Sequence, residues 1–306
     1  MGAGMMLFAT SRQKRGWGKW AIIRHFFIRG GLLIVLQLLV VNRAWELSPS
    51  GWGVRTYAGV LFALGGTMIL GSLLLWLKPK VLLGLTILLV VGTELLVPDP
   101  SLWGPGTNPL DLLLMVPGGI GSGENLVLWS NYPILPWLEL VTFGLVFGYW
   151  LVDNPRKAFE RSLKLGGAFL LGFLIIRYLD GFGNIRPRMG NSWMDFLNPV
   201  KYPPSITFTL LTMGLNLIVM AAFAQSSEKV QKFLRPLAVF GQTPLFFYIL
   251  HVFLYAGLAW WMTPNGTSTP AMYPYWILGL LILFPLCRWY SLFKHRQLAN
   301  SILRFL

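Results

Sequence analysis

One histidine stands where its chemistry would matter most. His251 is the only side chain that titrates near neutral pH in the apolar run from Pro236 to Met262. A run of that length predicts a membrane-spanning helix, and a titratable group at bilayer depth is costly enough to mark a functional candidate. Because the unperturbed pKa of imidazole is about 6.5, its neighbours decide whether it acts as a base, an acid or a neutral donor. We therefore predict that His251 is a catalytic base or an orienting group, with Tyr248 one turn away as a substrate contact.

A second set of useful side chains is concentrated between residues 180 and 205. The segment combines carboxylate, amide and ammonium groups with aromatic rings, a mixture that suits a sugar or another polyhydroxyl ligand. Loop structure alone also explains its glycines and prolines. The substrate contacts that we predict here are Asp195, Asn198, Lys201 and Tyr202.

Four further charged residues lie near the ends of apolar runs. Glu139 is deep enough that we expect it to pair with Arg177, and both structural pairing and substrate contact are open for the two residues. Arg24 and Arg29 begin the first long apolar run. Their side chains either extend to lipid headgroups or clamp an anionic cofactor.

Composition fixes the class of protein. Of the 306 residues, 55% are hydrophobic and 12% are charged, and the mean hydropathy is +0.60. These values exclude an ordinary soluble globular protein and indicate an integral membrane protein. The single cysteine, Cys287, excludes an internal disulfide, and three histidines without close spacing make a metal site unexpected.

The apolar runs predict an all-α, polytopic bundle of transmembrane helices in one domain over residues 1–306. A span needs about 20 residues. The sequence GQTP at 241–244 predicts a break or kink in the seventh span, because proline removes an intrahelical hydrogen bond. Residues 1–10 are too short to span and look like the remnant of a further span. The eight complete spans that we predict are 20–42, 56–77, 80–97, 134–152, 162–179, 203–225, 236–262 and 273–290.

Basic residues gather in every second connection between these spans. The positive-inside rule places such connections in the cytoplasm, together with both termini, and makes 98–133 and 180–202 extracytoplasmic loops. The net charge of +14 is then explained by topology, so we expect no nucleic-acid partner. We expect a multi-pass protein of the plasma or inner membrane, with lipids and a small-molecule or glycan acceptor as partners and a homodimer left open. The residues concerned are Arg12, Lys14, Arg15, Lys19, Lys78, Lys80, Arg156, Lys157, Arg161, Lys164, Lys229, Lys232, Arg235, Arg288, Lys294, Arg296 and Arg304.

With this topology, most polar residues at membrane depth lie toward the outer side. If the helices converge, these residues form a polar chamber that opens outward and reaches down to His251, with the segment 195–201 above it.

Several strings resemble one known family, the multi-pass membrane proteins related to heparan-alpha-glucosaminide N-acetyltransferase. They are FFIRGGLLIVLQLLVVNRAW at 26–45, YPILPWLELVTFGLVFG at 132–148, FLNPVKYPPSITFTLLTMG at 196–214 and FGQTPLFFYILH at 240–251. The resemblance covers nearly the whole chain. It implies transfer of an acetyl group from acetyl-CoA, as cosubstrate on the cytoplasmic side, to an amino sugar or glycan-type acceptor outside.

The resemblance also bears on the histidine. Family members begin with a further span that carries an Asp-x-x-Arg-Gly type motif, and the histidine to which catalysis is attributed lies just after it. We expect this chain to start beyond that region, near the point that Gly2-Ala3-Gly4 continues, which leaves a truncated form open. His251 matches a different family position, so the resemblance implies a supporting place in the pocket for it.

Two other classes of function are left open by the residues. A polar site at the membrane midplane beside a broken helix also suits a transporter, although the two halves of the chain show no inverted repeat. A non-catalytic membrane binding protein is the other alternative.

Overall fold

A computed structural model describes residues 1–47, 56–97, 108–121 and 127–297. The chain divides into two compact units. Unit 1 comprises Met1–Gln37 and Val54–Gln225, and unit 2 comprises Leu38–Gly53 and Ser226–Leu306. The expected single domain over 1–306 stays a prediction, and each unit is described by itself.

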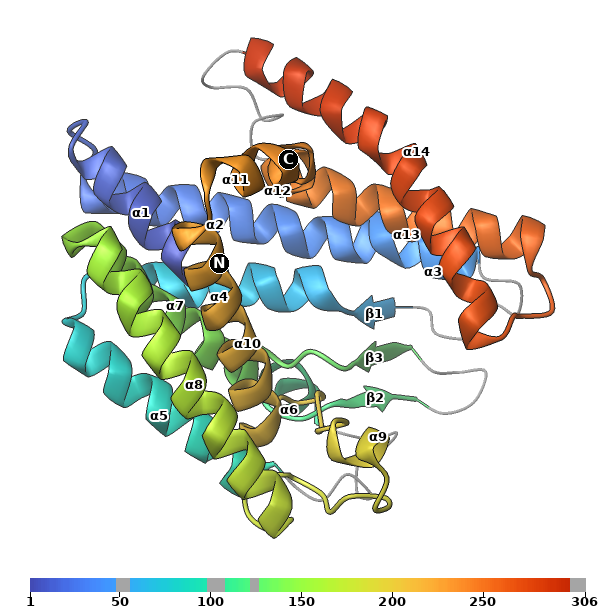
Figure 1. The fold of residues 1–306 in the computed structure, drawn as a ribbon, viewed down its shortest axis with the longest axis horizontal. Helices are drawn as coiled ribbons and strands as arrows, with labels where there is room; N and C mark the ends of the chain where they lie inside the picture. The colour runs from blue at the N-terminus through green and yellow to red at the C-terminus, as the bar shows by residue number, and fades with distance from the viewer. Residues whose placement is uncertain (48–55, 98–107, 122–126, 298–306) are drawn as a thin grey trace. The chain divides into compact units, whose positions relative to one another are not determined.

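Unit 1 consists mainly of long helices (Figure 1). Proline stands in the first turn of α5 and α8, where no intrahelical N–H bond is lost, and the Asn154 side chain caps α8 by accepting from the backbone of Lys157 over 3.0 Å. The helices are α1 (Gly2–Gln13), α2 (Lys19–Leu36), α4 (Val60–Leu74), α5 (Pro79–Leu96), α6 (Pro109–Leu114), α7 (Ile134–Asp153), α8 (Pro155–Leu179), α9 (Trp193–Phe196) and α10 (Ile206–Gln225).

Unit 2 contains the remaining helices and is built around the α13–α14 pair. Ser291 of α14 donates to the side-chain oxygen of Gln242 over 3.0 Å, and the rings of Phe246 and Tyr290 stack with centroids 4.1 Å apart. The helices are α3 (Asn42–Glu46), α11 (Glu228–Leu234), the 3₁₀ turn η4 (Arg235–Leu237), α12 (Ala238–Gln242), α13 (Pro244–Met262) and α14 (Thr269–Arg296).

The predicted all-α membrane bundle is confirmed. Among the described residues, seven helices are long and apolar enough to cross a membrane, and one shorter apolar helix, α4, accompanies them. The seven are Lys19–Glu46, Pro79–Leu96, Ile134–Asp153, Pro155–Leu179, Ile206–Gln225, Pro244–Met262 and Thr269–Lys294. The first runs through α2, a π-helical turn, η1 (Gln37–Val41), and α3.

Two of the eight predicted spans are shorter in the structure, whereas α8 and α14 extend beyond the predicted runs 162–179 and 273–290. The run 56–77 begins as a strand, so its helix is only Val60–Leu74. The run 236–262 is interrupted at Thr243, as the sequence GQTP predicted, and only α13 is long enough to span. Hydropathy measures how apolar a run is, and it does not register where proline or strand pairing ends a helix.

A small three-stranded sheet was not predicted (Figure 1). Its strands are β1 (Thr56–Ala58), β2 (Gly118–Ile120) and β3 (Leu128–Ser130), in the order β1-β3-β2. Strand β3 pairs in parallel with β1 and antiparallel with β2, so that Trp129 is opposite both Tyr57 and Gly119. Strands of three residues are too short to show alternation in the sequence, which is why this part of 98–133 was expected to be a loop.

Small residues set the close packing of helices in unit 1. A Cβ atom on Gly30 of α2 would lie 2.7 Å from the carbonyl oxygen of Gly65 in α4, and one on Gly166 of α8 would lie 2.9 Å from that of Gly214 in α10. Such contacts are typical of membrane helices, whose backbones approach where no side chain intervenes. Helix α1, which contains most of residues 1–10, packs on α7.

Candidate functional site

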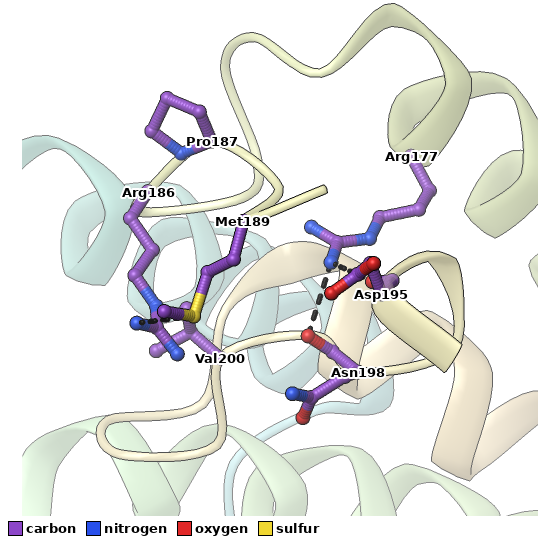
Figure 2. Close-up of a pocket in the computed structure, with 7 residues that line it drawn as sticks. All are labelled: Arg177, Arg186, Pro187, Met189, Asp195, Asn198 and Val200. Atoms are coloured by element: carbon purple, nitrogen blue, oxygen red, sulfur yellow. Dashed lines mark hydrogen bonds between the residues drawn. The ribbon is translucent and has the colours of Figure 1, made fainter. Parts of the chain in front are cut away.

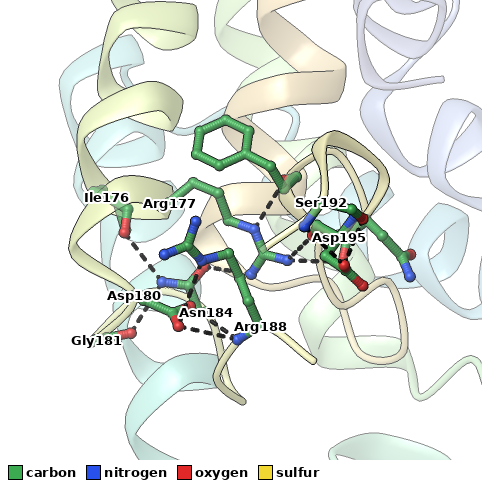
Figure 3. Close-up of polar contacts among 10 residues, drawn as sticks. Ile176, Arg177, Asp180, Gly181, Asn184, Arg188, Ser192 and Asp195 are labelled. Carbon is green, nitrogen blue, oxygen red and sulfur yellow. Dashed lines mark hydrogen bonds and ion pairs between the residues drawn. The ribbon is translucent and has the colours of Figure 1, made fainter. Parts of the chain in front are cut away.

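Arg177, near the end of α8, fastens the loop that follows it (Figure 3). It is only 2% exposed. Its Nε donates to the carbonyl oxygen of Phe196 over 3.0 Å, and Nη2 donates to those of Asp195 and Asn198 over 2.7 and 3.0 Å. Nη1 donates to Oδ1 of Asn184 over 2.9 Å. The guanidinium is thus engaged in holding backbone, which makes Arg177 a structural brace.

The predicted pair between Glu139 and Arg177 is wrong. Glu139 of α7 is 1% exposed, and its Oε1 accepts from the Thr209 hydroxyl of α10 over 2.5 Å. Its Oε2 is buried with no hydrogen-bond partner among the described residues. The hydrophobic pattern gave both residues a similar depth, but it could not show that Arg177 donates to three backbone carbonyls of the loop and to the Asn184 side chain.

Glu94 of α5 holds the other end of the same loop. Its Oε1 accepts from the backbone N–H groups of Gly183 and Ile185 over 3.0 and 2.6 Å, and its Oε2 accepts from Ile206 over 3.4 Å. A carboxylate that binds several backbone N–H groups fixes the path of a chain. The segment 180–205 is therefore anchored at both ends.

Asp195 closes a capping box on α9. Its Oδ2 accepts from the Ser192 hydroxyl over 2.5 Å and from the Ser192 backbone over 3.1 Å, while its own N–H donates to that hydroxyl. These hydrogen bonds from Ser192, the hydroxyl first, hold the pKa of Asp195 below its usual value. The carboxylate thus has a local role in the loop. Its use as a substrate contact stays a prediction.

Asn198 lies beside Asp195 in a small hollow of the same loop (Figure 2). The backbone oxygen of Asn198 accepts a hydrogen bond from Arg177, and the residue itself is exposed to solvent. The remaining walls come from Arg186, Pro187, Met189 and Val200. With a volume of about 10 Å³, this hollow has room for roughly one water-sized group, so it cannot enclose a sugar.

Lys201 lies beside the rings of Tyr202 and Tyr132, and we call these three residues the aromatic platform. The Tyr202 hydroxyl is 2.9 Å from the hydroxyl of Tyr132, and the Lys201 ammonium lies 4.9 Å from the Tyr202 ring centroid and 5.8 Å from that of Tyr132. A cation above aromatic faces is held without losing its charge. These two predicted residues therefore present an ammonium and hydroxyls at one place.

A cavity of about 480 Å³ lies next to this platform, between α1, α4, α7 and α10. Tyr132 belongs to both features, and the Trp137 ring is 5.2 Å from the Tyr132 ring. Most of the wall is apolar. The exceptions include Trp137, whose buried Nε1 has no hydrogen-bond partner among the described residues, and Asn216. The lining is Met1, Ala3, Val60, Ala63, Leu64, Thr67, Tyr132, Trp137, Leu140, Val141, Phe143, Gly144, Phe147, Met213, Asn216, Leu217 and Met220.

Three of these lining residues were missed by sequence reasoning. Tyr132 and Trp137 lie in a string that had been used only for family resemblance. Asn216 lies near the middle of α10, and the search for polar groups at membrane depth that selected His251 could have selected this amide as well.

The sequence matches the family of heparan-alpha-glucosaminide N-acetyltransferase, catalytic, over residues 1–175, and the family of OpgC protein over residues 128–295. The chain belongs to the heparan-alpha-glucosaminide N-acetyltransferase family of membrane acyltransferases. No curated protein matches the sequence. Membership implies use of an acyl-CoA in general.

In this acyltransferase, His251 and Tyr248 belong to unit 2. The His251 Nδ1 lies 3.1 Å from the carbonyl oxygen of Phe247, and the two rings stack. Because a carbonyl only accepts, Nδ1 is the donor in this contact. The chamber that would join His251 to 195–201 involves both units, so it stays a prediction.

The predicted cofactor residues lie on α2 of the acyltransferase. Arg24 is exposed, whereas Arg29 is half-buried and its Nε has no hydrogen-bond partner in the described part of the chain. Neighbouring His25 stacks on Phe8 of α1 with centroids 4.4 Å apart. Contacts to lipid or to cofactor both stay predictions. No cluster of three or more His, Cys, Asp or Glu that could hold a metal was found within the described ranges.

Proposed function

We propose that the protein transfers an acetyl group from acetyl-CoA to an extracytoplasmic amino sugar or glycan-type acceptor. Membership of an acyltransferase family and the membrane-spanning helices support this function. The observation that carries it is the cavity of about 480 Å³, whose apolar wall contains the Trp137 N–H, for which no described residue is an acceptor.

The cavity has the dimensions of a channel for the acyl-bearing arm of the donor. Its volume falls in the usual range of ligand sites, roughly 300–1,000 Å³. The α7 residues in its wall run from Trp137 to Phe147, which corresponds to about 15 Å of helix rise. An extended thioester arm is long and mostly apolar with a few amide groups. Asn216 and Trp137 can bind such amide or carbonyl groups.

The acceptor would bind at the platform of Lys201, Tyr202 and Tyr132. An ammonium and two hydroxyls beside aromatic faces can bind the hydroxyl groups and the faces of a sugar. The exposed Asn198 adds an amide on the same stretch of chain. Because Tyr132 also lines the cavity, a bound acceptor would be close to an acyl group at this end.

The chemistry is attack on a thioester. The acceptor nitrogen or oxygen forms a bond to the acyl carbon, the carbon–sulfur bond breaks, and the thiolate of CoA leaves. The Trp137 N–H would donate to the carbonyl oxygen as negative charge develops on it. The acceptor releases a proton as this bond forms, and a base or the departing thiolate takes it up.

A transfer assay tests this function. Membranes that contain the protein are incubated with radiolabelled acetyl-CoA and a panel of amino sugars and glycans. Trp137→Phe keeps an aromatic, though smaller, side chain and removes the N–H, so we expect kcat to fall about 100-fold with little change in KM for acetyl-CoA. The control is Trp260→Phe, because Trp260 is 66% exposed and lies in unit 2. An absence of acetylated product across the panel would overturn the proposal and leave a transporter or a binding protein.

We also place the protein in the cell membrane with both termini in the cytoplasm. The alternation of basic connections supports this orientation. A reporter fusion at the C-terminus would test it, since an extracytoplasmic signal contradicts the arrangement.

A further inference from the structure

A groove lies along the outer end of α8, away from the acyl cavity. It has a volume of about 380 Å³, and its wall is formed by Leu174, Ile175, Tyr178 and Leu179 of α8 with Phe196 of α9. None of these residues lines the cavity. The α8 residues are at least half exposed, and Tyr178 reaches 76%. In a helix that crosses the membrane, such exposed apolar residues face hydrocarbon. The groove therefore lies on the lipid-facing surface.

Positive charge stands at the end of this groove. The Arg188 guanidinium is 5.8 Å from the Phe196 ring centroid, and Arg188 pairs with Asp180 over 3.5 Å (Figure 3). Arg186 has no ion pair among the described residues, and its Nη1 donates to the sulfur of Met189 over 3.6 Å (Figure 2). The loop therefore offers more cationic than anionic groups next to an apolar channel.

The residues around the groove are of the types found at the boundary between membrane hydrocarbon and lipid headgroups. Met189, Trp193 and Met194 of the same loop are 78%, 72% and 61% exposed. Exposed tryptophan and other apolar side chains are stable at this depth, where one side is apolar and the other is wet. Two arginines on the side that we expect to be extracytoplasmic also depart from the positive-inside tendency, which indicates a local use for them.

We propose that this groove binds an anionic phospholipid of the surrounding bilayer. One acyl chain lies along Leu174, Ile175 and Tyr178, and the phosphate is bound by Arg186 and Arg188. Guanidinium groups bind phosphate oxygens through paired N–H donors. The occupant is a lipid, because the groove continues the lipid-facing surface of α8 on which Leu171 is 60% exposed. The site does not depend on the proposed acyl transfer.

The test measures lipid selectivity of the purified full-length protein. Protein in detergent is exposed to equal amounts of phosphatidylglycerol and phosphatidylcholine, and the bound lipids are counted by native mass spectrometry. We expect a preference for phosphatidylglycerol that falls about fivefold in Arg186→Gln. Arg186 has no ion pair, so its replacement leaves no buried charge unpaired. Arg186→Lys should keep part of the preference.

A second variant separates the groove from general charge effects. Ile175→Trp fills the groove while keeping the surface apolar, and we expect it to lose the bound phosphatidylglycerol even though Arg186 remains. Arg156→Gln is the matched control, since this arginine is 91% exposed at the far end of α8 and pairs with Glu160. Equal binding of the two lipids by the unaltered protein, or an unchanged preference in both Arg186→Gln and Ile175→Trp, would overturn the proposal. Recovery of a protein partner in place of lipid would also overturn it.

Discussion

Nη2 of Arg177 lies 2.7 Å from the carbonyl oxygen of Asp195, joining the end of a membrane-spanning helix to a loop 18 residues further along the chain. The same guanidinium donates to the carbonyl oxygens of Phe196 and Asn198, so one buried side chain fixes three residues of the predicted acceptor loop. Lys201 and Tyr202 of the platform come shortly after Asn198 in the chain. The position of Lys201 therefore depends on Arg177 through the backbone.

Replacing Arg177 should loosen this loop. Arg177→Lys keeps the charge but cannot supply donors in the planar arrangement that the carbonyls use. We expect the free energy of unfolding to fall by about 1–3 kcal/mol for each carbonyl left without a donor. We also expect faster proteolysis between residues 186 and 197. Limited proteolysis followed by mass spectrometry measures the rate of cleavage in this loop, with Arg156→Lys as the control. A cleavage rate equal to that of the unaltered protein would show that Arg177 is not the brace.

The capping box of Asp195 should respond to acid. Its pKa in the folded protein is lowered by hydrogen bonds from Ser192, so its stabilising effect is present above the unfolded pKa of about 4 and is lost as the pH falls through the folded value. Asp195→Asn should therefore raise the rate of backbone hydrogen exchange in α9 at pH 7. At a pH below the folded pKa of Asp195, the two proteins should exchange at similar rates. A difference between the two proteins that grows on acidification would contradict this assignment.

Two adjacent glycines of α8 offer a matched pair for testing helix packing. A Cβ on Gly166 would lie 2.7 Å from Cγ1 of Ile218, whereas a Cβ on Gly167 would meet nothing within 4 Å. Gly166→Val should cost about 1–3 kcal/mol by overpacking and lower the Tm in detergent by several degrees. Gly167→Val should leave it almost unchanged. Equal effects of the two changes would mean that α8 and α10 are not packed as described.

Sequence reasoning predicted the fold at the level of membrane-crossing helices and their approximate places in the chain. Apolar runs located the spans because length and hydropathy are properties of the run itself. The break before Pro244 was predicted for the same local reason. The strand β1 and its pairing with β3 were not, since three-residue strands are fixed by partners distant in the chain. The limits of the run 56–77 were wrong on that account.

The candidate site was predicted less completely. Residue type alone selected Lys201 and Tyr202, and the structure places them together above Tyr132. The expected partner of Glu139 was wrong, because the choice between Arg177 and Thr209 depends on which helix faces lie opposite one another. Trp137 was missed because a tryptophan near a helix end is ordinarily a membrane-interface residue. Only the cavity beside it and its unpartnered N–H distinguish it.

The most direct test of the central claim is binding of radiolabelled acetyl-CoA to the purified protein, which requires no knowledge of the acceptor. Leu140→Trp places a large ring in the wall of the cavity, and Leu171→Trp places the same ring on the lipid-facing surface of α8. We predict that Leu140→Trp abolishes saturable binding while Leu171→Trp binds like the unaltered protein. Undiminished binding of acetyl-CoA by a folded Leu140→Trp variant would contradict the assignment of this cavity to the acyl donor.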